Sequence, residues 1–136
     1  MPDQQTTIHV CVTCREPDEA EPASERPGAR LHHALSRAAS RRASPVAIRP
    51  VECLSVCKRP CTIGFSAPGK WTYVYGDFAP TEDAAELILD AAALYAAAPD
   101  GLIPWRQRPE ALKKGVVARI PPLADPAINA LPEAAE

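Results

Sequence analysis

The sequence predicts a single domain of the α/β class, in which a strand, a helix and a second strand precede a β-hairpin and another helix. Two observations lead to this prediction. Stretches in which apolar residues alternate with period two are interleaved with stretches in which they recur at helical spacing. Segments rich in Pro, Gly and Ser separate these stretches, as expected for turns and loops. A chain of 136 residues can bury one hydrophobic core but not two.

The amino-terminal part is expected to form a β-α-β unit. Residues 6–12 (TTIHVCV) alternate and are β-branched, as in a strand, whereas residues 15–28 are polar, Pro-rich and without a period, as in a loop. Apolar residues recur at helical spacing over 29–43, and Ser44-Pro45 ends that helix because the residue before proline avoids the α region. The second strand is expected over 45–52 (PVAIRPVE), where Pro50 indicates an edge strand or a strand end.

The following segments are expected to form a hairpin and a second helix. Residues 62–65 (TIGF) and 71–76 (WTYVYG) flank a Pro-Gly turn, and Thr81 can cap a helix that PDG at 99–101 stops. A short helix is expected around 109–114. The domain should cover residues 1–122, and the Pro/Ala/Glu-rich residues 123–136 should form a disordered tail. A β-α-β unit joined to a hairpin and a helix is the thioredoxin-like arrangement, here with a short C-terminal extension.

Composition limits the classes of function. The first residues lack the basic start and apolar run of a signal peptide, and no apolar run reaches the length of a membrane span. We therefore expect a cytoplasmic protein, in which thiols stay reduced. Aromatic residues make up only 5% of the chain, which disfavours nucleic-acid binding. No Ser/His/Asp set, phosphate loop or pair of catalytic carboxylates can be recognised, so we expect no enzymatic activity.

Five cysteines are the most informative feature of the sequence. Cys11 and Cys14 close the first predicted strand, and Cys53 and Cys57 close the second. If these strands are parallel neighbours, as a β-α-β crossover usually makes them, both pairs leave the sheet at the same end. Four thiols from two loops would then converge. Cys61 follows as a fifth, close to the start of the third strand.

The cysteines allow three interpretations: burial in the core, thiol–disulfide exchange and metal binding. Burial as small hydrophobic residues is disfavoured for the whole set, because each lies at a strand end or in a loop with polar neighbours. Thiol–disulfide exchange at Cys11 and Cys14 is disfavoured because the loop after them is acidic and the next predicted helix begins only near residue 29. Metal binding is the interpretation that remains. Four thiolates suit tetrahedral zinc as well as a [2Fe–2S] cluster, so ligand type leaves both open.

The sequence also resembles known families. At CLSVC (53–57) it is similar to the thioredoxin-like [2Fe–2S] ferredoxins. Over most of its length it resembles a family of metal-binding proteins of unknown function that are often encoded near cobalamin-synthesis genes. The segments that carry this resemblance are CVTCR (11–15), CLSVCKRPCTIGF (53–65), APGKWTYVYGD (67–77) and PDGLIPWRQRPEALKKGVVARIPP (99–122). The ferredoxin resemblance implies Cys11, Cys14, Cys53 and Cys57 as the cluster ligands. Cys61 is either an alternative ligand in place of Cys57 or a packed residue.

Other motifs are expected to be structural. Trp71, Tyr73 and Tyr75 share one strand face by period two and should belong to the core or cover the sheet. His9 in the first strand, and His32 and His33 in the first helix, are expected to be structural or exposed rather than metal ligands.

The expected function is therefore that of a small soluble [2Fe–2S] ferredoxin-like electron carrier, which the resemblance connects with cobalamin biosynthesis. The alternative is a module that stores, delivers or senses zinc or cobalt through the same cysteines. A carrier needs a redox partner protein, and a basic segment could dock it; its residues are Trp105, Arg106, Arg108, Lys113 and Lys114. The competing expectation is that Trp105 packs into the core. The oligomeric state is left open.

Overall fold

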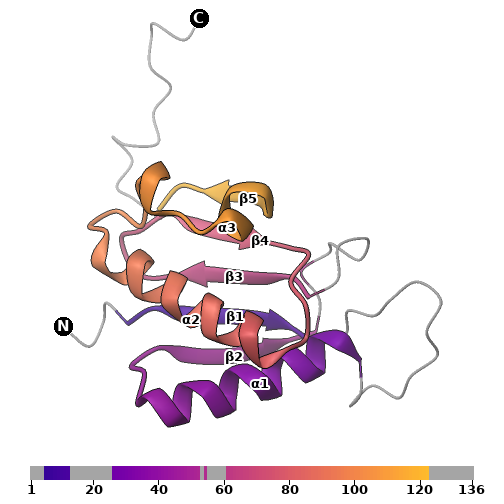
Figure 1. The fold of residues 1–136 in the computed structure, drawn as a ribbon. Helices are drawn as coiled ribbons and strands as arrows, with labels where there is room; N and C mark the ends of the chain where they lie inside the picture. Colours follow the sequence, from indigo (N-terminus) through magenta and orange to yellow (C-terminus); the bar gives the residue numbers. More distant parts are fainter. Residues whose placement is uncertain (1–4, 13–25, 53, 55–60, 123–136) are drawn as a thin grey trace, which may run out of the picture.

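A computed structural model describes residues 5–12, 26–52, 54 and 61–122 of the chain. Five strands form one sheet, and helices of different lengths connect them (Figure 1). The elements in chain order are β1 (Thr7–Cys11), α1 (Pro27–Arg42), β2 (Ala47–Val51), β3 (Ile63–Ser66), β4 (Thr72–Tyr75), α2 (Glu82–Ala97), the 3₁₀ turn η3 (Trp105–Gln107), α3 (Glu110–Lys114) and β5 (Val116–Ile120). The predicted tail at 123–136 lies outside the described residues.

The sheet has the order β2-β1-β3-β4-β5. β1 runs parallel to β2, as predicted for a β-α-β unit, and antiparallel to β3. β3 and β4 form the predicted hairpin. β2 is an edge strand, which agrees with the prediction from Pro50, because a residue without an N–H is tolerated at a sheet edge.

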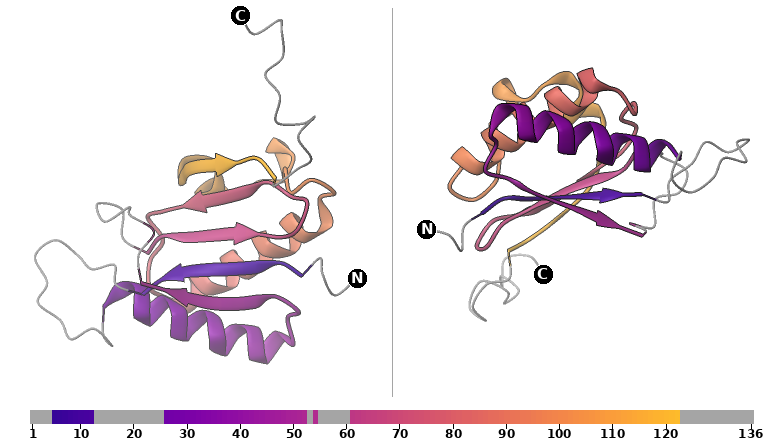
Figure 2. Two further views of the ribbon diagram at one scale, coloured as in Figure 1. Left: turned by 180° about the vertical axis from the view of Figure 1, so that it is seen from behind. Right: turned by 90° about the horizontal axis from the view of Figure 1, so that it is seen from below.

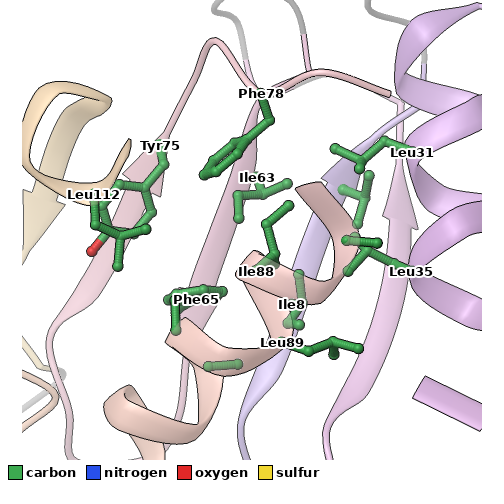
Figure 3. Close-up of a cluster of buried hydrophobic side chains, with 14 of the residues drawn as sticks. Ile8, Leu31, Leu35, Ile63, Phe65, Tyr75, Phe78, Ile88, Leu89 and Leu112 are labelled. Atoms are coloured by element: carbon green, nitrogen blue, oxygen red, sulfur yellow. The ribbon is translucent and has the colours of Figure 1, made fainter. Parts of the chain in front are cut away.

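Both long helices cover the same face of the sheet, as the view from below in Figure 2 shows. The strands alternate accordingly. Ile8 and Val10 of β1 are fully buried, whereas Thr7 and His9, which alternate with them, are only half-buried. In Figure 3, Ile8 and Ile63 lie between the sheet and the helices, close to Leu35 of α1 and Ile88 of α2. One core between a single helical layer and the sheet therefore holds the domain together.

Aromatic side chains fill the part of the core between α2 and the hairpin. The rings of Tyr73 and Tyr75 stack with centroids 5.5 Å apart, and Phe65 meets the edge of Tyr75 at 5.6 Å. Tyr95 of α2 contacts Phe65 and donates its hydroxyl to the carbonyl oxygen of Trp71. Burial raises the pKa of Tyr95 to about 12, so the hydroxyl stays protonated and can donate this hydrogen bond at neutral pH. The prediction that these strand aromatics belong to the core is confirmed.

An ion-pair network joins the exposed sides of α1 and α2. Arg37, Arg41 and Arg42 of α1 pair with carboxylates of α2 at 2.7–3.2 Å, and the acceptors are Glu82, Glu86 and Asp90. Since these groups are largely exposed, each pair contributes little to stability. Their main consequence is that the charges of this surface neutralise one another.

The ends of two predicted helices agree with the structure for identifiable reasons. The Thr81 hydroxyl accepts a hydrogen bond from the Ala84 amide at 3.2 Å and caps α2 as predicted. The short helix expected around 109–114 is α3. α1, however, begins at Pro27, two residues before its predicted start, because proline is well suited to the first position of a helix.

The carboxyl-terminal strand is the main element that the sequence analysis missed. β5 was expected to be part of a short extension, yet it pairs antiparallel with β4 and completes the sheet. It is only five residues long and lies between Gly115 and Pro121, so its own pattern is weak. Pairing with the preformed hairpin stabilises it. No helix in the described part of the chain is long and apolar enough to cross a membrane.

The first turn of α1 lies directly against the end of β1. A Cβ atom placed on Gly28 would meet the carbonyl oxygen of Cys11 at 1.9 Å and the Cα of Val12 at 3.3 Å. Such distances are far below van der Waals contact, so only glycine allows this approach. A glycine inside a helix is unfavourable by about 1 kcal/mol relative to alanine, and its presence here is explained by this contact.

The first testable prediction concerns Gly28. Gly28→Ala should lower the free energy of unfolding by about 3 kcal/mol, because the helix or the strand end must shift to make room for the methyl group. Urea unfolding followed by circular dichroism measures this loss. Gly64→Ala is the matched control, since its Cβ would meet the nearest atom, the carbonyl oxygen of Tyr73, only at 3.3 Å. Equal effects of the two substitutions would contradict the contact at Gly28.

The second prediction concerns the pH dependence of stability. Burial, followed by the charge of Arg49, lowers the pKa of His9 below 6.5, and its Nε2 lies 2.8 Å from the Ser66 hydroxyl. Just below pH 6.5 the unfolded chain therefore binds more protons than the folded chain, so stability should fall as the pH drops. Urea unfolding at pH 7.5 and pH 5.5 should show a smaller fall for His9→Gln than for the unchanged protein. His33→Gln serves as the control, and the same fall in all three proteins would refute the role of His9.

Candidate metal centre

The carboxyl ends of β1 and β2 lie side by side at one end of the sheet. Cys11, the last residue of β1, is in register with Val51, the last residue of β2. The amide of Val12 donates to the carbonyl oxygen of Val51 at 2.9 Å, which keeps the chains together beyond the strands. The prediction that the two strands are parallel neighbours ending at the same place is thus confirmed. Their arrowheads point the same way in Figure 1.

Cys11 is the candidate ligand that the structure describes. Its residue is only 3% exposed, and its Sγ lies 3.8 Å from the carbonyl oxygen of Glu52, to which the thiol donates. Glu52 immediately precedes Cys53 in the chain, and consecutive Cα atoms are about 3.8 Å apart. The sulfur of the first predicted ligand therefore lies next to the backbone that leads into the second predicted pair. Cys14, Cys53 and Cys57 lie outside the described residues.

The first turn of α1 adds a favourable electrostatic environment. Its Gly28 contacts the backbone of Cys11, and the turn contains no acidic residue. Unpaired N–H groups give a helix N-terminus a partial positive charge, which stabilises a nearby thiolate or another anion. The expectation that the first helix begins far from the first cysteine pair is therefore wrong for the backbone of Cys11. It rested on separation along the chain, whereas the fold brings residue 28 back to residue 11.

Burial separates Cys11 from a typical redox-active thiol. Reactive cysteines of oxidoreductases lie in electropositive but partly exposed surroundings, where a second thiol or a substrate can reach the sulfur. Cys11 has the electropositive neighbour but almost no exposed surface. This combination suits a thiolate held at a metal better than a thiolate that attacks a disulfide.

Cys61 occupies a different place from Cys11. It is 1% exposed and belongs to the hydrophobic core cluster, where it precedes β3. Its φ of 59° is in the left-handed region, which is uncommon for residues other than glycine. The next residue, Thr62, is hydrogen-bonded to the backbone of Cys11, whose amide donates to the Thr62 carbonyl oxygen at 3.1 Å. Of its two expected roles, the packed position describes what the structure shows for Cys61.

Within residues 5–12, 26–52, 54 and 61–122, no group of three or more His, Cys, Asp or Glu side chains could hold a metal ion. His32 and His33 contact each other, with ring centroids 5.9 Å apart. A thiolate-rich centre at the ends of β1 and β2 is consistent with the described part, since Cys11 offers a buried soft donor beside a helix N-terminus.

The expected docking residues lie toward the β5 edge of the sheet, away from the edge strand β2. Trp105 is 59% exposed, so the alternative in which it packs into the core is wrong. Arg106 lies beside it in η3, and Lys113 and Lys114 belong to α3. Arg108 links this surface to the core, since its Nε donates to the carbonyl oxygen of Ile103 at 2.8 Å. Sequence analysis found these residues but not Gly28, whose only signal was a glycine immediately before the predicted helix.

Comparison with known proteins places this geometry in context. A search among curated proteins returned no match. Two solved structures of a thioredoxin-like [2Fe–2S] ferredoxin from Aquifex aeolicus match with TM-scores of 0.56 and 0.52, each at 16% identity. The matches cover 89% and 85% of this chain and 98% of the ferredoxin chains. The fold is accordingly that of the thioredoxin-like ferredoxins.

The family assignment rests on the sequence rather than on the fold. Residues 8–122 match the model of the family described as "Protein of unknown function (DUF1636)". The matched range begins in β1 and ends just after β5, so it includes all five cysteines and the whole sheet. The chain therefore belongs to this family of proteins of unknown function.

Proposed function

We propose that this protein is a small electron carrier that holds a [2Fe–2S] cluster with Cys11, Cys14, Cys53 and Cys57 and has no catalytic activity of its own. The observation that carries the proposal is the position of the Cys11 sulfur, 3.8 Å from the carbonyl oxygen of Glu52 where two parallel strands end. Neighbouring strands are about 4.8 Å apart, so loops leaving them can present two thiolates each to one small centre.

The surroundings of Cys11 support an anionic centre that is shielded from water. When bound, a [2Fe–2S] cluster supplies a one-electron redox couple, and its potential depends on local charge, hydrogen bonds to sulfur and solvent exposure. The chain contributes burial of Cys11 and the partial positive charge of the α1 N-terminus. The fold of the ferredoxins from Aquifex aeolicus is a further support for this cofactor over zinc.

The same proposal extends to the pathway in which the carrier acts. On the resemblance to proteins encoded near cobalamin-synthesis genes, we propose that the carrier serves cobalamin biosynthesis in the cytoplasm, with a reductase or an acceptor enzyme as its redox partner. Deleting the gene in its host should then create a requirement for added cobalamin. Growth without cobalamin at the normal rate would separate the carrier from that pathway and leave the cofactor assignment in place.

The cofactor can be tested on the purified protein. Protein made in its native host and purified without oxygen should be brown, contain iron and acid-labile sulfide in equal amounts, and lose visible absorption on addition of dithionite. Elemental analysis and absorption spectra measure these properties. Colourless protein with stoichiometric zinc, or protein with stoichiometric cobalt and neither iron nor sulfide, would refute the electron carrier and support the alternative, a module that stores, delivers or senses that metal.

The ligand set can be tested by single substitutions. Cys11→Ser, Cys14→Ser, Cys53→Ser and Cys57→Ser should each lose most of the bound iron, because thiolate ligands provide both charge and attachment for the centre. Cys61→Ser is the matched control and should keep the iron, since Cys61 packs in the core. Iron content per folded chain is the measurement. Iron loss in Cys61→Ser combined with retention in Cys57→Ser would show that Cys61 is a ligand in place of Cys57.

A further inference from the structure

Trp105 is held in place although it is exposed. Its ring lies between two cations, with the Arg108 guanidinium 5.4 Å and the Lys113 ammonium 5.2 Å from the ring centroid. Arg108 is itself anchored, because it donates to the Ile103 carbonyl oxygen at 2.8 Å and lies 5.8 Å from the centroid of Tyr73. An aromatic side chain that is exposed but already ordered loses little entropy on binding, as in the anchor residues of interfaces.

The cations around Trp105 have little negative charge to neutralise them. We use the name Trp105 surface for Trp105, Arg106, Lys113 and Lys114. Among the described residues, Lys114 pairs with Glu110 at 3.5 Å, and both side chains are highly exposed. No ion pair of Arg106 or Lys113 is found within the described part of the chain. The arginines of α1 differ, because each of three pairs with carboxylates of α2.

The distribution of charge along the chain makes this surface a positive pole. Residues 102–122 contain five cationic side chains and the single carboxylate of Glu110, a net charge of +4. The whole chain has a net charge of −2, so the remaining residues have a net charge of −6. Outside 102–122, the described residues carry seven cationic side chains and seven carboxylates, so the net positive charge of the described part is concentrated in this segment and attracts an acidic partner.

The part of the Trp105 surface that α3 contributes, Lys113 and Lys114, lies toward the end of the sheet where Cys11 lies. Val116, which follows α3, is in register with Tyr75, Tyr75 with Ile63, and Ile63 with Val10 beside Cys11. α3 therefore leads into the sheet at the strand end where Cys11 lies, as the position of α3 in Figure 1 shows. Three strand spacings separate β1 from β5, a distance of about 14 Å.

We propose that the Trp105 surface docks an acidic redox protein, with Trp105 as the anchor and the three cations as the steering charges. This inference rests on the proposed function and adds the partner's surface chemistry and its place of contact. Such a contact is expected to be small and short-lived, as is usual for electron-transfer complexes. A second exposed apolar side chain, Ile120, lies on β5 and provides a comparison within the same molecule.

The kinetic test uses oxidised plastocyanin, an acidic copper protein, as the probe. The dithionite-reduced protein, freed of excess reductant, loses one electron as copper(II) becomes copper(I), and stopped-flow absorption follows the transfer. Arg106→Glu should slow the second-order rate at low salt by about tenfold and weaken its dependence on salt. Arg49→Glu on β2 is the matched control and should change the rate by no more than about twofold. Cytochrome c, a basic acceptor, should not be slowed by Arg106→Glu.

The anchor is tested separately from the charges. Trp105→Ala should slow transfer to plastocyanin while leaving the salt dependence of the rate unchanged, because it removes contact area and no charge. Ile120→Ala is the control and should leave the rate unchanged. Equal slowing by Arg106→Glu and Arg49→Glu, or by Trp105→Ala and Ile120→Ala, would overturn the docking surface, since net charge or general hydrophobicity would then explain the rates.

A binding test separates failure of this inference from failure of the cofactor assignment. Copper(I) plastocyanin, added to ¹⁵N-labelled protein, should shift amide signals of residues 105–114 more than those of β2, with or without a bound cluster. Iron and sulfide analysis judges the cofactor independently. Shifts centred elsewhere would refute the docking surface. Displacement of plastocyanin from these amides by a lower concentration of a single-stranded oligonucleotide would also refute it and would assign the surface to nucleic acid.

Discussion

The contact between the first turn of α1 and the backbone of Cys11 is the constraint on which the candidate metal centre depends. It brings a helix N-terminus to the end of β1, and the absence of a side chain on Gly28 makes this approach sterically allowed. The parallel pairing of β1 with β2 then places Glu52 beside the Cys11 sulfur. Backbone packing, rather than a long network of side chains, thus defines the described part of the centre.

The same packing explains why a buried thiol can be useful here. A buried cysteine in apolar surroundings is normally inert, because a thiolate is poorly solvated there. Cys11 is almost fully buried, and its backbone lies against the first turn of α1, whose partial positive charge favours an anionic centre close to it. This arrangement supports the proposed thiolate ligand rather than a thiol that exchanges with thiols in solution.

Charge is arranged differently in two parts of the molecular surface. Between α1 and α2 the arginines are neutralised by Glu82, Glu86 and Asp90, so that surface has little long-range field. Around Trp105 the cations are mostly without such partners among the described residues, whereas cations and carboxylates are equal in number over the rest of the described part. Composition alone, with a net charge of −2, conceals this asymmetry. The proposed docking of an acidic partner rests on it.

The local elements could be predicted from the sequence, because they depend on signals a few residues apart. Alternation predicted β1 and the hairpin, Thr81 predicted the start of α2, and Pro50 predicted an edge strand. The cysteine positions predicted that two strand ends would matter. The pairing of Cys11 with Val51 followed from the general rule for β-α-β units.

Tertiary structure alone decided the remaining features, because each depends on residues far apart in the chain. β5 is stabilised by pairing with β4 and has no strong pattern of its own. The approach of Gly28 to Cys11 is created when α1 packs on the sheet, so distance along the chain gave the wrong expectation for its helix N-terminus. Trp105 stays exposed, and Arg108 and Lys113 lie near its ring. Sequence by itself determined the elements with strong local patterns and the positions of the thiols, whereas packing decided which of them meet and added β5.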